Sequence, residues 1–451
     1  MLLLSSYKSP YPKFTEHFAD GTTKEITQEI PFEIPKNWAW CRLGEIGHWA
    51  AGSTPSRKKT EYYNKGSIPW LKTGDLNDGY INNTAEFITD FALQKCSLRL
   101  NPIGSVLIAM YGATIGKLGI LNIEATTNQA CCACVPYLGV NNKFLFFYLY
   151  TQKRILQEKA EGGAQPNISK EKLCNFLFPL PPLAEQQRIV EKIEELLVWV
   201  EQLEQNKTEL KTYLQQTKAK VLDEAIHGKL VPQNPDDEPA SVLLEKIRNE
   251  QKAIAPKNKK TLHNEHYGEE SFPIPKNWAW CRLGEVCKFL NGYAFNSKDY
   301  NTHGIPLVRI SNIQNNKIEL KDAVFINRPI DEKFTIKKGD LLIAMSGATT
   351  GKMGNYTLDE NAYLNQRIGN IRVRNENVLY PIYRDYFMQT KSNEILKMAY
   401  GGAQPNISGE IINSIYFPLP PLEEQKRIVQ KIEKIFAELE IIEELLDENM
   451  N

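Results

Sequence analysis

The chain contains one sequence unit written twice, and this repeat limits its possible folds more than any other feature. Twelve residues, IPKNWAWCRLGE, occupy positions 34–45 and recur unchanged at 274–285. Three further segments repeat in the same order: LIAMYGATIGKLG and LIAMSGATTGKMG at 107–119 and 342–354, GGAQPNIS at 162–169 and 401–408, and FPLPPLAEQQRIVEKIE and FPLPPLEEQKRIVQKIE at 178–194 and 417–433. A fixed order at nearly constant spacing predicts two copies of one structural unit.

Between the first two markers the copies differ. The first reads AGSTPSRKKTEYYNKGSIPWLKTGDLNDGYI and the second reads LNGYAFNSKDYNTHGIPLVRISNIQNNKIEL. Both stretches mix short runs of β-forming residues with Gly, Asn and Asp turns, which is typical of compact strands and loops with a little helix. We therefore expect two globular modules of mixed α/β (α+β) class, and 451 residues are enough for both.

A long helix follows each FPLPPL segment. Paired prolines close an extended stretch, and helix-forming residues with acidic groups in the first turn come next. Apolar residues then alternate at spacings of four and three, which predicts a coiled coil between this helix and its copy. The length of the segment that joins the two halves allows these helices to lie antiparallel. The predicted seam consists of Ile189, Ile193, Leu196, Val200 and Leu203 in the first copy and Ile428, Ile432, Ile435, Leu439 and Ile442 in the second.

These patterns divide the chain into six segments. The joining segment has a Gly stop, a Pro-rich turn and a short amphipathic pattern at 240–253, and its length allows a pseudo-twofold arrangement of the two modules. The predicted segments are an N-terminal extension (1–30), a first recognition domain (31–182), a first spacer helix (183–228), a linker with a short helix (229–272), a second recognition domain (273–421) and a second spacer helix (422–451).

Charge is balanced over the whole chain but differs between its parts. The chain has 54 Lys and Arg against 54 Asp and Glu. Residues 46–120 have eight basic and five acidic side chains, and residues 286–355 have ten and six, whereas both helices are acidic. A DNA duplex, with about one negative charge per 1.7 Å, is attracted to the modules rather than to the helices. An ordinary solvated surface explains the same small excess equally well.

No catalytic or metal-binding pattern is present in the sequence. GATIGK at 112–117 and GATTGK at 347–352 have three residues between the glycines, where a phosphate-binding loop of the Walker type has four. A tight turn between strands, with glycines at positive φ, is one interpretation of both. Contact of Lys117 and Lys352 with backbone phosphate is the other.

The divergent stretches contain the candidate DNA contacts. Hydroxyl and basic side chains suit phosphate, Arg suits guanine and Asn suits adenine, although a turn-rich surface loop has the same composition. The candidates in the first module are Ser53, Thr54, Ser56, Arg57, Lys58, Lys59, Lys72, Thr73 and Asp75, together with Lys117. Those in the second are Tyr293, Phe295, Asn296, Lys298, Arg309, Ser311 and Asn312, together with Lys352. The pairs Asn128–Gln129 and Asn365–Gln366 are shared, which favours a scaffold role over base reading.

Eight cysteines lack paired CxxC spacing, and three of them crowd into positions 131, 132 and 134. Neither a disulfide framework nor a zinc site favours such spacing, so we expect reduced thiols. No stretch approaches the roughly 20 apolar residues of a membrane span. These features predict a cytoplasmic protein without a membrane partner.

The repeated motifs together resemble the specificity subunits of type I restriction-modification systems. LIAMxGATxGK in both halves, GGAQPNIS before FPLPPLxEQxRIVxKIE, and the central HGKLVPQNPDDEPASVLLEKI carry the resemblance, which extends from about residue 30 to 451. The resemblance implies a non-enzymatic subunit with two target recognition domains, each reading one half of a bipartite double-stranded DNA sequence. It also implies that two modification subunits with S-adenosylmethionine dock on the helices and that restriction subunits using ATP and magnesium join them, while this chain itself binds no cofactor.

Two other functions remain compatible with the sequence. The same module could serve as the DNA-targeting subunit of another defence system, or the chain could be a coiled-coil scaffold that binds no DNA. An autonomous methyltransferase does not fit, because the LPPL segments lack the Asn and the aromatic residue with which such enzymes hold a flipped base. If the modules read different half-sites, the divergent spans 48–90 and 287–330 carry the sequence choice.

Overall fold

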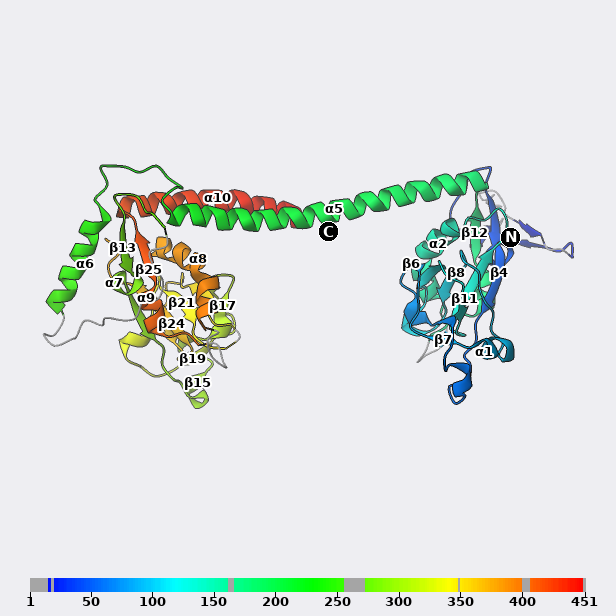
Figure 1. Ribbon diagram of the computed structural model, residues 1–451, viewed down its shortest axis with the longest axis horizontal. Helices are drawn as coiled ribbons and strands as arrows, with labels where there is room; N and C mark the ends of the chain where they lie inside the picture. Colours follow the sequence, from blue (N-terminus) through cyan, green and yellow to red (C-terminus); the bar gives the residue numbers. More distant parts are fainter. Residues whose placement is uncertain are drawn as a thin grey trace, which may run out of the picture. The chain divides into compact units, whose positions relative to one another are not determined.

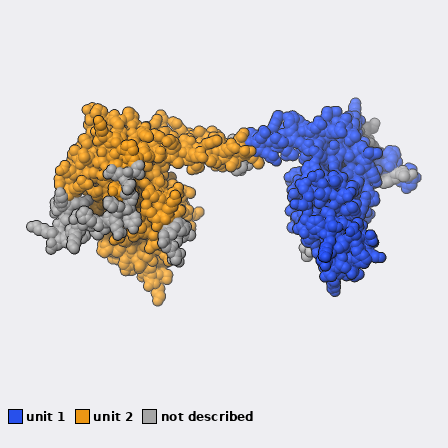
Figure 2. Space-filling view, in the orientation of Figure 1, with its two compact units in different colours: residues 1–203 blue, residues 204–451 orange. Residues whose placement is uncertain are grey.

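The computed structural model describes residues 15–17, 20–160, 166–254, 272–347, 349–399 and 406–448 (Figure 1). The chain forms two compact units, unit 1 of residues 1–203 and unit 2 of residues 204–451 (Figure 2). The GGAQ half of each GGAQPNIS marker, and residues 1–14 of the predicted N-terminal extension, lie outside the described residues. Each unit contains one predicted module, and both modules are mixed α/β as expected.

Unit 1 is built around a five-stranded sheet of order β4-β11-β8-β9-β6. Its strands are Gly47–Ala51 (β4), Cys131–Pro136 (β11), Val106–Ala109 (β8), Leu118–Leu121 (β9) and Gly79–Ile81 (β6). A smaller sheet contains Thr126–Thr127 (β10), Ile68–Leu71 (β5) and Phe87–Ile88 (β7), and a hairpin contains Thr15–His17 (β1) and Thr23–Glu25 (β2). The helices are Asp90–Lys95 (α1), Asn142–Thr151 (α2), Lys153–Glu158 (α3) and Lys170–Cys174 (α4).

The central strands of unit 1 are apolar on both faces because each face has its own core. In β8, Val106 and Ile108 join the cluster that α2 covers, and the alternate residues Leu107 and Ala109 join a second cluster on the other side. The cysteines of β11 divide in the same way. Side chains alternate along a strand, so two cores require a continuous apolar run rather than an alternating one.

Unit 2 repeats this plan with larger sheets. The six-stranded sheet is formed by Cys287–Asn291 (β14), Ile368–Val373 (β24), Leu341–Ala344 (β21), Met353–Asn355 (β22), Lys317–Ile318 (β18) and Ile313–Gln314 (β17), in this order. The five-stranded sheet is formed by Tyr300–Asn301 (β15), Val324–Ile326 (β19), Ile305–Val308 (β16), Ala362–Leu364 (β23) and Thr335–Ile336 (β20). The helices of its module are Leu283–Val286 (α7), Pro381–Ala399 (α8) and Gly409–Ser414 (α9).

The repeated WAWCR and FPL segments pair with each other at the base of each module. In unit 1, Ala39–Arg42 (β3) is antiparallel to Leu177–Leu180 (β12), and in unit 2, Ala279–Arg282 (β13) is antiparallel to Tyr416–Leu419 (β25). Trp38 and Trp40 are both half-buried, against Phe144 and Phe32 respectively. The identical twelve residues therefore build the frame of each module rather than its divergent loops.

Two long helices begin immediately after these ribbons. Leu183–Ile226 (α5) starts after the first proline pair and Leu422–Glu448 (α10) after the second, while Ala240–Ile254 (α6) confirms the short helix expected in the linker. Within unit 2 the end of α5 runs antiparallel to α10, because Lys211 pairs with Asp447 at 2.6 Å and Lys218 pairs with Glu443 at 2.8 Å. The antiparallel pairing of the two helices is confirmed.

The helix pairing is shorter than the heptad pattern indicates. Ile428 and Ile432 are fully buried in the core of unit 2, and Ile435 and Leu439 are half-buried. In unit 1, however, Leu196, Val200 and Leu203 are 45, 50 and 67% exposed, and only Ile189 and Ile193 are half-buried. Within unit 2, the ion pairs between α5 and α10 involve Lys211 and Lys218 of α5.

Candidate nucleic-acid interface

The divergent loops of unit 1 leave the same end of its main sheet. The antiparallel register pairs Cys132 with Ala51 and Cys131 with Ala109, so the ends of β4 and β8 meet the start of β11. Loops 52–67, 110–117 and 127–130 therefore emerge together. The loop after β5 joins them, because β5 runs parallel to β10, which leads into the 127–130 turn.

Hydrogen bonds connect these loops to one another. Ser53 N donates to Thr127 O at 3.0 Å, and Asn128 N donates to Leu71 O at 2.8 Å. The indole Nε1 of Trp70 donates to Ser53 O at 3.0 Å. The Thr54 hydroxyl also bonds the Gln129 side chain. The loops are thus held as one rigid surface, although they are separate in the sequence.

Arg57 is the most strongly positioned basic side chain on this surface. Its guanidinium carbon lies 4.5 Å from the ring centre of Tyr63 and 5.0 Å from that of Trp70, and one terminal nitrogen bonds Glu86. Lys72 bonds the other oxygen of the same carboxylate. Arg57 nevertheless remains 54% exposed. An arginine stacked on aromatic rings and fixed by a carboxylate is preorganised to present its remaining donors to a ligand.

Glu86 is a site residue that the sequence did not reveal. Hydrogen bonds from Lys72 and Arg57 hold the pKa of Glu86 below its ordinary value, so this carboxylate is ionised at neutral pH. Glu86 lies beside Trp70 because Trp70 N donates to Glu86 O at 3.0 Å. This pairing joins residues sixteen positions apart, and no local pattern signals it.

Unit 2 brings together the matching loops. Tyr293 N donates to Leu364 O at 2.8 Å, Gln366 N donates to Tyr293 O at 2.9 Å, and Asn365 N donates to Val308 O at 3.3 Å. The surface has its own arginines. Arg309 lies 6.0 Å from the ring centre of Tyr300, and Arg328, absent from the sequence-based candidates, lies 5.7 Å from that of Tyr293 and pairs with Asp299 at 3.3 Å.

Several of the candidate DNA contacts in unit 2 line a small cavity. Its volume is about 320 Å³, and it is lined by Tyr300, Arg309, Ile310, Ser311, Asn365, Gln366 and Arg367. One terminal nitrogen of Arg309 donates to Asp322 O at 3.2 Å. Its Nε is enclosed and has no hydrogen-bond partner among the described residues. An unsatisfied donor of this kind is costly unless a ligand accepts from it.

Three sequence-based candidates have structural roles instead. Phe295 is 7% exposed and packs in a cluster with Leu307, Ile326 and Tyr363. Asn312 is 2% exposed, accepts from Arg309 N at 2.9 Å and donates to Glu319 O at 3.0 Å. Asp75 accepts from Lys72 N at 2.7 Å in the matching turn of unit 1. We therefore remove Phe295, Asn312 and Asp75 from the candidate contacts, because packing or turn formation already accounts for them.

The remaining candidates lie in the loops described above. Thr54, Ser56, Lys58, Lys59, Asn296, Lys298 and Ser311 are exposed, and Ser53, Lys72, Thr73, Tyr293 and Arg309 are half-buried. Lys59 also donates to Tyr62 Oη at 3.3 Å. These side chains are available to a ligand at the loop end of each sheet.

The GATxGK segments are tight turns between antiparallel strands, which was the first of the two interpretations of the sequence. Gly112 and Gly116 have φ of 62° and 81°, and Gly347 and Gly351 have φ of 88° and 85°. Lys117 is exposed beside the 128–130 turn, where Met110 N donates to Ala130 O at 2.8 Å. Lys352 is half-buried and donates to Gln314 Oε1 at 3.3 Å.

The shared Asn-Gln pairs support the backbone of the same turn. The Asn128 side chain accepts from Ala130 N at 3.1 Å, and the Asn365 side chain accepts from Arg367 N at 3.2 Å. An Asn that bonds the backbone two residues later stabilises a turn by itself. The scaffold role is therefore supported for both asparagines.

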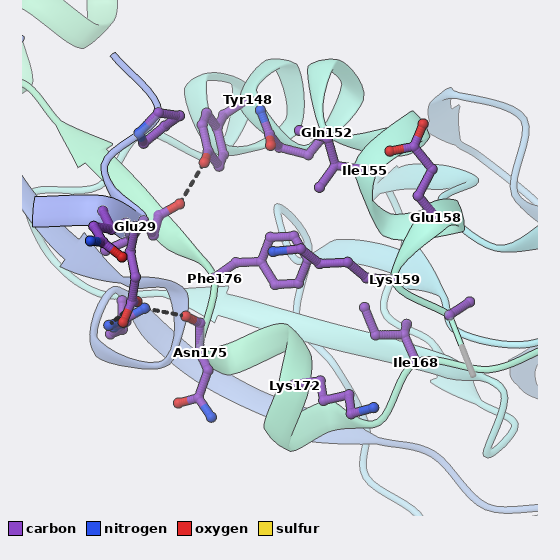
Figure 3. Close-up of a pocket in the computed structure, with 15 residues that line it drawn as sticks. Glu29, Tyr148, Gln152, Ile155, Glu158, Lys159, Ile168, Lys172, Asn175 and Phe176 are labelled. Atoms are coloured by element: carbon purple, nitrogen blue, oxygen red, sulfur yellow. Dashed lines mark hydrogen bonds and ion pairs between the residues drawn. The ribbon is translucent and has the colours of Figure 1, made fainter. Parts of the chain in front are cut away.

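A cleft at the base of unit 1 is lined by residues of the N-terminal segment and of helices α2, α3 and α4. Figure 3 shows this cleft of about 780 Å³, where Lys159 lies over the Phe176 ring and Arg42 donates to Asn175 O at 2.7 Å. The other donors of Arg42 bond Glu16 and Glu29, so this arginine joins the N-terminal segment to the module. No metal-binding group of three His, Cys, Asp or Glu side chains exists among the described residues.

All eight cysteines are free, and several are deeply buried. Burial raises the pKa of Cys132 and of Cys287 to about 12. These two thiols therefore remain protonated at neutral pH and pack as small apolar groups. Within the described part of the chain, no helix combines the length and apolar character that crossing a bilayer requires.

Comparison with known proteins agrees with this geometry. A family model for the type I restriction modification DNA specificity domain matches the chain twice, at residues 35–212 and 275–448. The EcoAI specificity subunit of Escherichia coli is 24% identical over 482 residues, covering 90% of this chain and 79% of that protein. The MjaVIII specificity subunit of Methanocaldococcus jannaschii is 24% identical, covering 90% of this chain and 88% of that protein.

Solved structures show the same fold. The crystal structure of the HsdS subunit from Thermoanaerobacter tengcongensis superposes with a TM-score of 0.62 at 20% sequence identity, covering 93% of this chain and 94% of that chain. The two matched domains occupy most of the sequence, and each coincides with a module and the helix that follows it. The chain therefore belongs to the DNA specificity subunits of type I restriction-modification systems.

Proposed function

We propose that each unit reads one half of a bipartite double-stranded DNA target through the loops at the end of its sheet. The observation that carries the proposal is that both modules place different loops on the same frame. In both units the loop after the first sheet strand, the loop after β5 or β16, and the shared Asn-Gln turn are hydrogen-bonded together. Two modules that share a fold but carry different loops are suited to bind two different half-sites.

The side chains on these loops suit base and phosphate contacts. A guanidinium group donates to both acceptors of guanine in the major groove. The guanidinium groups on the two loop surfaces are those of Arg57, which is 54% exposed, and of Arg309, which is half-buried. Lys58, Lys59 and Lys117 are exposed in unit 1 and suit phosphate oxygens. The excess of basic residues near the loops is small, so sequence-specific contacts must supply much of the preference for the target.

We further propose that the long helices bind two modification subunits. Five consecutive residues of α5, Leu196 to Val200, are 45–51% exposed, and Ile441, Ile442 and Leu445 of α10 are 57, 40 and 55% exposed. Exposed apolar surface of this extent is typical of a protein interface. The bound subunits would supply S-adenosylmethionine and methylate adenine, restriction subunits would supply ATP-driven, magnesium-dependent cleavage, and this chain itself would catalyse nothing.

Methylation sequencing of a host that expresses the chain with its modification subunits tests the bipartite reading. We expect Arg57→Ala to relax the sequence requirement in one half-site and Arg309→Ala to relax it in the other. A bidentate arginine contact contributes about 1–3 kcal/mol of discrimination, so the affected base should become partly tolerant.

Arg99→Ala is the matched control, because Arg99 is exposed in unit 1 but lies outside the converging loops. It should leave both half-sites unchanged. If Arg57→Ala and Arg309→Ala alter the same half-site, the assignment of one half-site to each unit is wrong.

A further inference from the structure

The Asn-Gln turn that both units share carries an arginine only in unit 2. Asn128 accepts from Ala130 N at 3.1 Å in unit 1, and Asn365 accepts from Arg367 N at 3.2 Å in unit 2. The carbonyl oxygen of this third residue accepts from the N–H of the equivalent methionine, at 2.8 Å in unit 1 and 2.9 Å in unit 2. Ala130 and Arg367 therefore occupy equivalent positions, and the turn adds a guanidinium group to unit 2 alone.

A carboxylate that binds the basic side chains of unit 1 has no counterpart in unit 2. Lys72 and Arg309 follow the equivalent strands β5 and β16, which both begin with Ile-Pro, and Lys72 bonds Glu86. Glu86 lies opposite the third residue of β5, and Val324 lies opposite the third residue of β16. An apolar side chain thus stands in unit 2 where unit 1 has the carboxylate that binds Lys72.

The unit 2 cavity of about 320 Å³ combines Arg309 and Arg367, and no acidic side chain is among its described lining residues. Arg309 donates to a backbone oxygen at 3.2 Å, and its enclosed Nε has no partner in the described part of the chain. Arg367 is exposed, and no ion pair joins it to a carboxylate that the structure describes. Two positive charges at one cavity repel each other, and a bound anion offsets this repulsion. The cavity is therefore suited to an anion.

We propose that this cavity binds one phosphate group of the DNA backbone, with Arg367 as the main donor. The inference rests on the proposed function, because it takes duplex DNA as the ligand of this loop surface. A guanidinium group binds two phosphate oxygens through parallel N–H bonds, and Ser311 adds a hydroxyl to the same lining. A base edge has no net charge, so it would leave the charge of the two arginines uncompensated.

The proposed phosphate site anchors unit 2 on the duplex without choosing a sequence. Phosphate contacts fix the register and orientation of a protein on DNA, and base contacts supply the specificity. Arg309, which we assign to base reading, lines the same cavity and is positioned relative to the duplex by the anchor. Because unit 1 has Ala130 at the position of Arg367, we expect this anchor in unit 2 only.

Binding of the chain with its modification subunits to duplexes of their methylation motif, measured at several salt concentrations, tests the proposal. We expect Arg367→Ala to weaken binding at least tenfold, because a hydrogen bond to a charged group contributes about a tenfold change in an equilibrium or more. The slope of log K against log salt should fall by about 0.9, the value for one phosphate. Duplexes with single base changes should lose affinity by the same factor, and the methylated motif should stay unchanged.

Lys288→Ala is the matched control, because Lys288 is exposed in unit 2 near the start of β14, whose other end leads into the loops. It should leave the affinity and the salt slope unchanged. Arg367→Lys keeps a positive charge and should retain most of the slope. One uncharged methylphosphonate in the half-site of unit 2 should weaken binding of the parent chain about tenfold and that of Arg367→Ala hardly further.

Two results would overturn the phosphate site. One is that Arg367→Ala loses discrimination at a single base with an unchanged salt slope, which would make Arg367 a base-reading residue. The other is a methylphosphonate scan in which every position weakens the parent chain and Arg367→Ala equally. Both results leave the bipartite reading intact, and that reading fails separately if Arg309→Ala leaves both half-sites unchanged.

Discussion

At the scale of single residues, Glu86 controls how unit 1 presents its basic side chains. Its carboxylate bonds both Arg57 and Lys72. Glu86→Gln removes the charge that positions both groups. We expect weaker discrimination by about 1–3 kcal/mol at one half-site, together with tighter binding to random duplex, because one negative charge is lost near the DNA. Competition binding at fixed salt, with modification subunits present, measures both effects.

Glu61→Gln provides the comparison for this prediction, because Glu61 is an exposed carboxylate in the same unit that acts on Lys59 through its charge but, among the described residues, makes no ion pair of the kind that Glu86 makes with Arg57 and Lys72. Glu61→Gln should change the affinity for random duplex but not the discrimination at either half-site. Equal loss of discrimination at both half-sites in Glu86→Gln would show that the effect is not local to unit 1.

The residue scale is also where the sequence was least informative. Basic and hydroxyl side chains of the loops were found from composition alone. The packing of Phe295 was not foreseen, because its turn-rich neighbours conceal that it packs against Tyr363, 68 positions later. Glu86 and Arg328 were missed because their roles arise from strand pairing and loop contacts that no local spacing encodes.

At the scale of elements, one glutamine fixes each long helix to its module. The Gln186 side chain donates to Pro181 O at 2.8 Å and to Gly139 O at 3.0 Å, and accepts from Asn141 N at 2.8 Å. Gln425 makes the equivalent three bonds in unit 2. Gln186→Leu leaves buried backbone groups unsatisfied, at roughly 1–3 kcal/mol for each group. We expect a lower melting temperature for unit 1, measured by calorimetry.

Gln187→Leu is the neighbouring control, since Gln187 is exposed on the same helical turn and should change the melting temperature little. Equal destabilisation by both substitutions would mean that the loss reflects helix propensity rather than the bonds of Gln186.

The long helices show what a heptad pattern can and cannot predict. Apolar spacing correctly indicated two paired helices, and the length of the joining segment indicated that they lie antiparallel. Ile428 and Ile432 are buried as seam residues should be. The same spacing continues through Leu196, Val200 and Leu203, which are exposed. Periodicity shows that a helix face is apolar, but it does not show whether the partner is another helix of this chain or another protein.

At the scale of the whole molecule, the repeat distinguishes the residues that build the fold of each module from the loops that differ between the modules. The identical segments form the paired strands β3–β12 and β13–β25, and they include Gln186 and Gln425, which bond each long helix to its module. The divergent spans form the loops described above for each main sheet. This division was predictable from the sequence, because residues shared by two modules cannot distinguish the two different half-sites that we propose for them. The geometry of the loops was not predictable, since it depends on hydrogen bonds between segments far apart in the chain.

Replacing residues 48–100 by the equivalent span of another specificity subunit should therefore change one half-site and leave the other intact. The exchanged span contains β5, β6, β7 and α1 of unit 1, and all its cores lie within that unit. Units with separate cores respond independently to substitution. Methylation sequencing of hosts that carry the parent or the exchanged chain gives the two motifs directly. A motif altered in both halves would show that residues 48–100 act beyond unit 1, and an unchanged motif would place the reading surface outside this span.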